Sequence, residues 1–328
     1  MTTAEILEGF KKLKALVVGD ICLDRWCTYD PATSEPSRET GIPRLGIVST
    51  EVTPGGGGTV ANNLAALGAE TVAVLGIRGE DGFGFELVQA LNERGITARL
   101  MVEIRRWQTF TYTKLLNGQT GIEDQPRVDF ISTQPLPLEA EKRVINNLVS
   151  AIEDFDVVLV ADQAETASGG VVTPAVRDAI IELAEKHAGK VFLVDSRKRV
   201  HLFRKVMVKP NRSEAEAACQ QLFGHLNLRR LREQLRARAL MVTHGPQGVL
   251  VVEEGKETWA KARPVEKPVD ICGAGDSFAA GTALTMAVTG DPVAAASFGN
   301  LVASITVMKK GTGTASPEEV IAAAAQGL

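Results

Sequence analysis

Short β-rich runs alternate with amphipathic helical stretches along most of this sequence. The apolar runs at residues 15–19, 157–160 and 191–194 have the length and composition of buried strands. Parallel strands need a long crossover between them, usually a helix, and such crossovers are right-handed. The alternation therefore predicts βαβ units around a mostly parallel sheet, which is the α/β class of fold.

The rest of the pattern extends this sheet and interrupts it twice. Further strands are expected at residues 71–75, 206–208, 240–243 and 248–252, and helices at residues 83–94, 139–152, 173–186, 274–289 and 292–307. Residues 23–52 are rich in Pro and Gly, and residues 99–128 contain a β-favouring run at 109–116. We expect these two segments to form one small accessory sheet within a single domain of residues 1–328.

Opposite charges nearly balance in this chain. The 36 Lys and Arg stand against 40 Asp and Glu, a net charge of −4, so no global basic field attracts nucleic acid or anionic lipid. The N-terminus lacks the apolar core of a signal peptide, and no apolar run approaches the ~20 residues of a membrane helix. We expect a cytoplasmic protein without nucleic-acid or membrane partners.

The four cysteines do not suggest a metal site or a disulfide framework. Cys22, Cys27, Cys219 and Cys272 show neither a CxxC pair nor Cys/His ligand spacing, which predicts reduced thiols. We interpret Cys272, which precedes a glycine turn, as a small buried packing residue.

The most informative motif is Gly273-Ala274-Gly275-Asp276, which opens an apolar helix near the C-terminal end. Its glycines permit a tight turn with exposed amides, and the positive end of the helix dipole would help to hold a phosphate that gains charge during transfer. Asp276 could then accept the proton of an attacking hydroxyl, the general-base role in phosphoryl transfer to an alcohol. The same residues suit a plain helix cap equally well, so the motif alone leaves both interpretations open.

A second glycine-rich segment lies near the N-terminal end. The run Gly55, Gly56, Gly57 and Gly58 leads into an amphipathic helix and would let a hydroxylated ligand approach the backbone, although glycine runs are also flexible loops. The chain contains no GxGxxG turn at this point and no GxxxxGK[ST] phosphate loop. Polar residues also follow the predicted strands, where α/β sheets bind ligands: Asp20, Asp24, Asp162, Asp195, Asn211 and Thr243.

Taken in order, these segments resemble the PfkB family of carbohydrate kinases, which share the ribokinase fold. The resemblance covers essentially the whole chain, at residues 19–24, 55–63, 211–214, 243–245 and 273–276. It implies a ribokinase-like three-layer α/β/α body with a mostly parallel central sheet and a small β lid made by residues 23–52 and 99–128. It also implies ATP-dependent phosphorylation of a sugar or sugar phosphate.

The resemblance assigns roles to individual residues. Asp276 is the implied base, and the amides of Gly273, Ala274 and Gly275 are the implied anion hole. Asp24, Asn63 and the four glycines at 55–58 are implied sugar contacts. Asn211, Thr243, Gly245 and Asn300 are implied nucleotide contacts, and Glu214 is implied to organise Mg²⁺, although an acid there also suits the first turn of a helix. ATP and Mg²⁺ are the implied cofactors, dependence on a monovalent cation stays open, and members often pair through the lid, which implies a homodimer.

Within the family, the chain most resembles the kinase half of the bifunctional heptose-phosphate kinase and adenylyltransferase, at residues 19–25, 54–68, 113–114 and 127–129. We expect no nucleotidyltransferase domain after the last family motif. Two departures leave the acceptor open: Thr59 stands where the family usually has Asn, and Gln163-Ala164-Glu165-Thr166 replaces a usual Tyr-Ala-Lys-Gly run. A heptose phosphate, a nucleoside or another alcohol remain alternatives, as does a pseudokinase that only binds a sugar or nucleotide.

Overall fold

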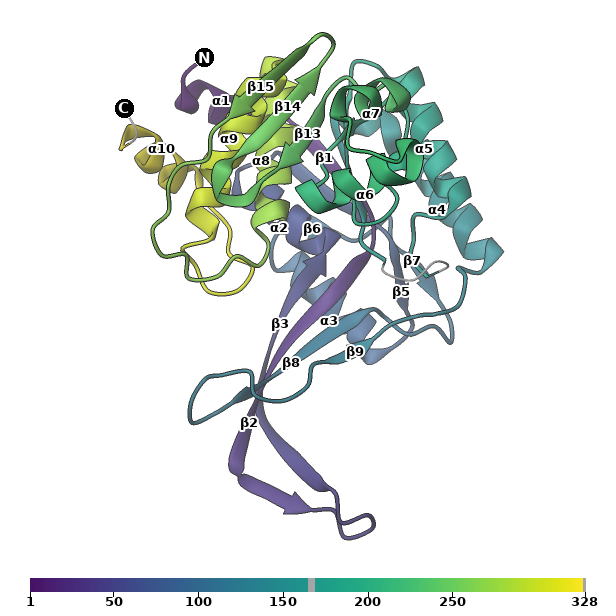
Figure 1. Ribbon diagram of the computed structural model, residues 1–328. Helices are drawn as coiled ribbons and strands as arrows, with labels where there is room; N and C mark the ends of the chain where they lie inside the picture. Colours follow the sequence, from purple (N-terminus) through teal and green to yellow (C-terminus); the bar gives the residue numbers. More distant parts are fainter. Residues whose placement is uncertain (165–168, 327–328) are drawn as a thin grey trace.

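A nine-stranded sheet forms the centre of the body in the computed structural model, which describes residues 1–164 and 169–326 (Figure 1). Its strands, in their order across the sheet, are β15 (Lys256–Ala260), β14 (Val249–Glu253), β13 (Leu240–Thr243), β12 (Met207–Val208), β11 (Val191–Ser196), β10 (Val157–Asp162), β1 (Lys14–Gly19), β4 (Thr71–Leu75) and β6 (Ile96–Thr97). All neighbouring strands are parallel except at one edge, where β14 is antiparallel to both β13 and β15. The mostly parallel sheet predicted from the alternation is confirmed.

Side-chain alternation along the strands divides the interior into two cores. Ala15 and Val17 of β1 face one core, and Leu16 and Val18 face the other. The first core is covered by α1 (Thr3–Phe10), α2 (Gly57–Ala66), α3 (Gly82–Asn92), α8 (Ala274–Thr289), α9 (Pro292–Thr306) and α10 (Pro317–Ala325). The second is covered by α4 (Leu138–Ala151), α5 (Pro174–Lys186), α6 (Arg212–Phe223) and α7 (Leu228–Leu235). Burial on both faces explains why the central strands read as unbroken apolar runs.

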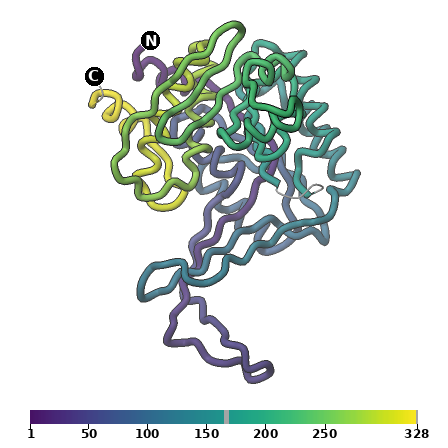
Figure 2. The backbone as a smooth tube through the Cα atoms, viewed as in Figure 1, coloured from purple at the N-terminus to yellow at the C-terminus, as the bar shows by residue number. Residues whose placement is uncertain are grey.

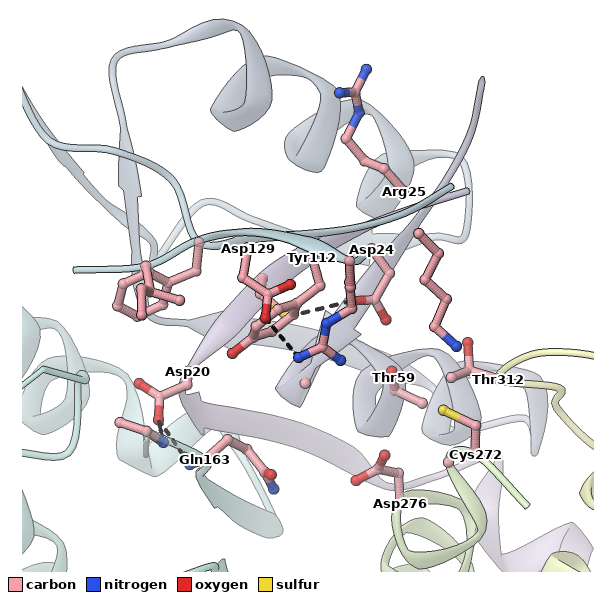
Figure 3. A pocket seen from close by; sticks show the side chains of 18 of the residues that line it. Asp20, Asp24, Arg25, Thr59, Tyr112, Asp129, Gln163, Cys272, Asp276 and Thr312 are labelled. Carbon is pink, nitrogen blue, oxygen red and sulfur yellow. Dashed lines mark hydrogen bonds and ion pairs between the residues drawn. The ribbon is translucent and has the colours of Figure 1, made fainter. Parts of the chain in front are cut away.

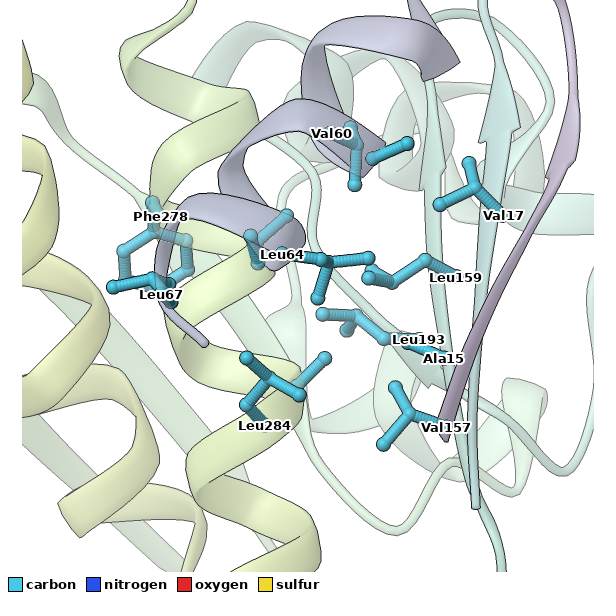
Figure 4. Packing of buried hydrophobic residues seen from close by; sticks show 14 of the residues in the cluster. Ala15, Val17, Val60, Leu64, Leu67, Val157, Leu159, Leu193, Phe278 and Leu284 are labelled. Carbon is cyan, nitrogen blue, oxygen red and sulfur yellow. The ribbon is translucent and has the colours of Figure 1, made fainter. Parts of the chain in front are cut away.

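Helices α2 and α8 pack together over the first core, although they come from opposite ends of the chain (Figure 4). Leu64 of α2 and Leu284 of α8 are fully buried, and Phe278 is nearly so. Each such side chain contributes about 1.5–3 kcal/mol by leaving water. This packing brings the glycine-rich start of α2 close to the start of α8, which carries the Gly273 turn.

A second, four-stranded sheet extends away from the body (Figures 1 and 2). Its order is β3 (Pro43–Gly56), β2 (Ile21–Pro36), β8 (Thr111–Asn117) and β9 (Val128–Phe130). Strands β2 and β3 form a hairpin of 16 and 14 residues, which is longer than the small excursion expected at residues 23–52. The hairpin is buried near the body and exposed at its tip, where Pro and Gly obscure the strand pattern. Part of the other segment, β7 (Val102–Ile104), pairs instead with β5 (Ile77–Gly79).

The glycine run is a packed junction rather than a flexible loop. Strand β3 ends at Gly56 and α2 begins at Gly57. Gly56 has φ of +56°, and a Cβ there would lie 2.7 Å from the carbonyl oxygen of Asp20. A Cβ on Gly57 would lie 2.6 Å from Cδ1 of Ile21. Glycine is therefore required because the backbones of β2 and α2 approach closely.

The longest helices of the body are too short or too polar to cross a bilayer: within residues 1–164 and 169–326, no helix qualifies as a membrane span.

Candidate active site

A cavity of about 310 Å³ lies between the carboxyl ends of the main-sheet strands and the base of the second sheet (Figure 3). Asp24 of β2 lines one side, and Asp276 at the start of α8 lines the other. Gly56 and Gly273 also line this cavity. The fold thus brings together residues that the sequence places at positions 24, 56, 273 and 276.

Asp276 lies in the first turn of α8, three residues after Gly273, which adopts the left-handed conformation at φ of 78°. Burial on the cavity floor and the negative charge of Asp195 raise the pKa of Asp276 to about 7. Lys209 and Arg197 oppose this rise with their positive charges. A carboxyl group with a pKa near neutrality can exchange protons at the pH at which most enzymes work.

The turn before Asp276 leaves only part of its backbone for a ligand. The amide of Ala274 donates to the carbonyl of Ile271 at 3.2 Å, and the amide of Asp276 donates to the carbonyl of Gly273 at 3.1 Å. Within the described part of the chain, the amides of Gly273 and Gly275 make no hydrogen bond. These two amides are therefore the available donors of the predicted anion hole.

A buried ion pair lies beneath this turn. The ammonium group of Lys209 is 3.0 Å from a carboxylate oxygen of Asp195, and both side chains are largely buried. Lys209 Nζ also lies 3.6 Å from the point that a Cβ on Gly275 would occupy. Burial is the largest single effect and opposes the charge of Lys209, but the carboxylates of Asp195, Glu214 and Asp276 together outweigh it and raise the pKa of the ammonium. Lys209 was not among the predicted site residues, although a lysine directly after an apolar strand is an identifiable signal in the sequence.

Asp24 depends on a neighbouring glycine. A Cβ on Gly55 would overlap the carboxylate of Asp24, so the absence of that atom creates the space in which the carboxylate lies. Burial raises the pKa of Asp24 to about 6, and the charges of Lys114 and Arg127 moderate the rise. The predicted contribution of Gly55 is thus indirect, through the placement of Asp24.

Asp20 also lines the cavity, but its carboxylate is fully engaged. It accepts hydrogen bonds from the backbone amides of Gln163, Ala164 and Val171, each at 2.8 Å. Burial nevertheless raises the pKa of Asp20 to about 6. Asp20 therefore ties the end of β1 to the connection after β10. Glu165 and Thr166, which belong to the altered run in that connection, lie outside the described residues.

Basic and aromatic side chains of the second sheet line the cavity opposite Asp276. Arg127 pairs with Asp129 at 2.6 Å, and its guanidinium lies 5.1 Å from the ring centre of Tyr112. Lys114 pairs with Glu123 at 3.6 Å. In the sequence, Lys114 and Arg127 were noted only as part of the resemblance to the heptose-phosphate kinases, and Tyr112 was not predicted to lie in the site. The β alternation of residues 109–116 places 112 and 114 on one face and is the signal that could have found it.

Several predicted site residues lie elsewhere. Asn63 is completely buried and donates to the carbonyl of Thr59 at 2.9 Å within α2, and Gly57 and Gly58 lie in the buried first turn of that helix. Thr59 itself lines the cavity. Cys272 was expected to be buried, and that prediction is wrong: the residue is exposed because the turn that carries it opens toward the cavity.

The predicted nucleotide residues divide between a second hollow and the interior. Asn211, Thr243 and Gly245 line a hollow of about 500 Å³ at the start of α6. Asn300 is buried and donates to the carbonyl of Ala260 at 2.8 Å, so it does not line that hollow.

Glu214 and Asn211 cap the start of α6 for each other. The side chain of Asn211 accepts from the amide of Glu214 at 2.9 Å, and the carboxylate of Glu214 accepts from the amide of Asn211 at 2.7 Å. Burial, with a contribution from Asp195, raises the pKa of Glu214. In the described chain, no group of three or more His, Cys, Asp or Glu residues is arranged to hold a metal ion. A single carboxylate with substrate phosphates suffices for Mg²⁺, so Glu214 fits that ion without a dedicated cage.

The layered body with a second sheet closing over a glycine turn and a carboxylate defines the ribokinase-like class of folds. Ribokinase from Thermotoga maritima superposes with a TM-score of 0.69 at 21% identity, covering 95% of this chain and 99% of that one. Phosphofructokinase-2 from Escherichia coli, solved in complex with potassium, gives a TM-score of 0.69 at 18% identity, covering 96% and 98%. These similarities confirm the predicted three-layer fold.

The family model described as pfkB family carbohydrate kinase matches residues 13–319, and the chain belongs to this family. Membership confirms the predicted enzyme class, an ATP-dependent carbohydrate kinase. Two relatives are the bifunctional protein HldE of Pelobacter propionicus, 32% identical over 98% of this chain, and that of Trichlorobacter lovleyi, 32% identical over 95%. The chain spans 65% and 62% of the length of these two relatives.

The raised pKa of Asp276 predicts a pH-dependent gain of stability for D276N. The folded protein binds this proton more tightly than the unfolded chain does, so the stability that the raised pKa provides is lost as pH rises through about 7. D276N cannot ionise and should gain about 2–3 kcal/mol in unfolding free energy relative to wild type between pH 5 and pH 8, most of it below pH 7. Urea unfolding at both pH values measures this difference. D178N, at an exposed aspartate of α5, is the control, and an equal pH effect in both variants would contradict the prediction.

Proposed function

We propose that this chain transfers the γ-phosphoryl group of ATP to a hydroxyl group of a sugar phosphate, with Asp276 as the general base. The observation that carries the proposal is the position of Asp276, a carboxyl group with a pKa near 7 that lies beside the Gly273 turn and faces Asp24 across one cavity. A base of that pKa is half ionised near neutral pH, which suits proton removal from an alcohol as it attacks.

In the proposed reaction, the acceptor hydroxyl loses its proton to the Asp276 carboxylate as its oxygen forms a bond to the γ-phosphorus. The bond between that phosphorus and the β–γ bridging oxygen breaks, and ADP leaves with the electron pair. The amides of Gly273 and Gly275 and the ammonium of Lys209 lie where they would stabilise the transferring group's charge. Asp24 would orient the acceptor by accepting hydrogen bonds from its hydroxyl groups.

The hollow lined by Asn211, Thr243 and Gly245 is the proposed nucleotide side of the site. Glu214, whose half-buried carboxylate would gain from a nearby cation, is the residue that would organise Mg²⁺ with the nucleotide phosphates. When bound, Mg²⁺ neutralises charge on the β- and γ-phosphates.

The second sheet provides the argument for a phosphorylated acceptor. Lys114 and Arg127 line the cavity with Asp24, as does Arg197 of the body, directly after β11, and cationic side chains of this kind bind phosphate strongly. A heptose phosphate fits this chemistry and the resemblance of residues 113–114 and 127–129 to the heptose-phosphate kinases. We propose that the second sheet also acts as a lid, which closes over the acceptor and excludes water.

The tip of the second sheet also favours a homodimer. Ile42, Ile47 and Val48 of the β2–β3 hairpin are 66%, 45% and 61% exposed, a concentration of apolar surface on a projecting arm. We propose that two copies pair through this sheet. Sedimentation at the mass of one subunit at micromolar concentration would exclude this pairing.

Replacing Asp276 tests the proposed base. D276N should lower kcat by about 10²–10⁴, the contribution typical of general-base catalysis, while KM for ATP changes little. Wild-type kcat/KM should rise with pH and level off above about 7, and D276N should lack this limb. The assay measures ADP formation with Mg²⁺ and K⁺ across hexoses, heptoses, their phosphates and nucleosides. Unchanged turnover by D276N would refute the base, and no turnover of any acceptor by wild type would favour a binding protein without catalysis.

Removing the positive charge at position 114 tests the phosphorylated acceptor. K114M should raise KM for a hexose or heptose phosphate about 10- to 100-fold, because a charge-assisted hydrogen bond to phosphate is lost. KM for the same sugar without its phosphate should stay within about twofold of wild type, since that acceptor never makes the contact. K142M, on the distant helix α4, is the matched control. An equal rise for both acceptors would show that Lys114 does not contact the phosphate.

A further inference from the structure

We propose that the first two turns of helix α3 seat the second sheet on the body, and that Asp81 and Thr109 are positioning residues that fix the register of β8. Through that register they would place Tyr112 and Lys114 in the cavity. The consequence for acceptor binding rests on the proposed kinase function, whereas the seating of the sheet does not.

Asp81 and Thr109 are joined by a compact set of hydrogen bonds across 28 residues of sequence. The hydroxyl of Thr109 donates to Oδ1 of Asp81 at 2.7 Å, and its amide donates to Oδ2 at 2.9 Å. The same hydroxyl accepts from the amide of Gly79 at 2.8 Å. Asp81 is also the N-cap of α3, since Oδ1 accepts from the amide of Gly84 at 2.7 Å. Thr109 is 1% exposed, so these bonds are not replaced by water.

Two glycines create the space for this set of bonds. A Cβ on Gly79 would overlap the carbonyl oxygen of Trp107 and lie 2.8 Å from Oδ2 of Asp81. A Cβ on Gly84 would overlap the carbonyl oxygen of Gly79 and lie 3.0 Å from the hydroxyl of Thr109. The backbone around Asp81 and Thr109 is therefore packed as closely as glycine allows, and the start of β8 has little freedom to shift.

The position of Thr109 determines what β8 presents to the cavity. Just after it, the amide of Leu23 donates to the carbonyl of Phe110 at 2.9 Å, and β8 then pairs with β2 from Thr111 onward. In this register Tyr112 lies beside Asp24, and Lys114 lies beside Trp26. A shift of one residue would turn Tyr112 and Lys114 to the opposite face of the sheet.

Helix α3 contacts two further strands of the second sheet. The ring of Phe83 packs edge-on against Phe130 of β9, with ring centres 4.9 Å apart. The guanidinium of Arg25 in β2 lies 4.8 Å from the centre of the Phe83 ring, and its Nε is 3.3 Å from Glu86. Arg25 borders the cavity, but in Figure 3 its guanidinium is directed away from Asp24 and Asp276, consistent with these contacts. With Thr109 at the start of β8, strands β2, β8 and β9 are all tied to one helix end.

The test compares T109V with T109S in the full chain. Valine keeps the shape of threonine but removes both hydroxyl hydrogen bonds, whereas serine retains them. T111V is the neighbouring control, because Thr111 is also buried on β8 but its hydroxyl donates to the carbonyl of Thr109 rather than to Asp81. Hydrogen exchange of the amides at residues 110–117 and 128–130 reports the seating of the sheet without any acceptor. Exchange in β10 and β11 of the same samples reports whether the body stays folded.

We expect T109V to exchange at least about tenfold faster at residues 110–117 with β10 and β11 unchanged, and T109S and T111V to stay within about threefold of wild type. With the hexose or heptose phosphate that wild type converts fastest, T109V should raise KM about tenfold and leave KM for ATP unchanged. Wild-type exchange at residues 110–117 in T109V would overturn the seating role. Faster exchange with an unchanged acceptor KM would overturn the positioning role, and the exchange result stands even if no acceptor is phosphorylated.

Discussion

The close approach of backbones where β2, β3 and α2 meet is the constraint on which the rest of the site depends. Glycine at position 55 leaves the space that the Asp24 carboxylate occupies, and glycines at 56 and 57 allow α2 to begin against Asp20 and Ile21. Helix α2 then packs on α8, which starts at the Gly273 turn. A single larger side chain in this junction would displace Asp24 and the Gly273 turn together, because both depend on the same contact.

Burial at the cavity raises the pKa of three of its carboxyl groups. Asp20, Asp24 and Asp276 all have raised pKa values because each is removed from water. They differ in what compensates them: three backbone amides hold Asp20, the charges of Lys114 and Arg127 lie near Asp24, and Lys209 and Arg197 lie near Asp276. Of these three environments, only that of Asp276 combines a pKa of about 7 with a glycine turn whose amides are available, which supports the choice of Asp276 as the proposed base.

The sequence was sufficient for the sheet and for the positions of Asp24, Gly273 and Asp276, because strand periodicity and an ordered set of motifs are local signals. It was insufficient where function depends on distant contacts. Asn63 matches the family motif, yet its side chain bonds inside its own helix, and Cys272 is exposed although small apolar residues are usually buried. Local patterns mark Lys209 as the residue after a strand and set the face of Tyr112, but their places at the cavity depend on the pairing of β12 and β8 with distant strands, which local patterns do not encode.

The cavity is built from two parts of different character. The body contributes Asp276 and the Gly273 turn, with the buried Lys209 beneath that turn. The second sheet contributes Trp26, Tyr112, Lys114 and Arg127 from strands whose outer portions are exposed. In the proposed reaction, substitutions on that sheet would therefore change which acceptor binds while leaving Asp276 and the Gly273 turn in place. Such a separation would let descendants of one ancestral enzyme evolve different acceptor preferences while inheriting the same transfer chemistry.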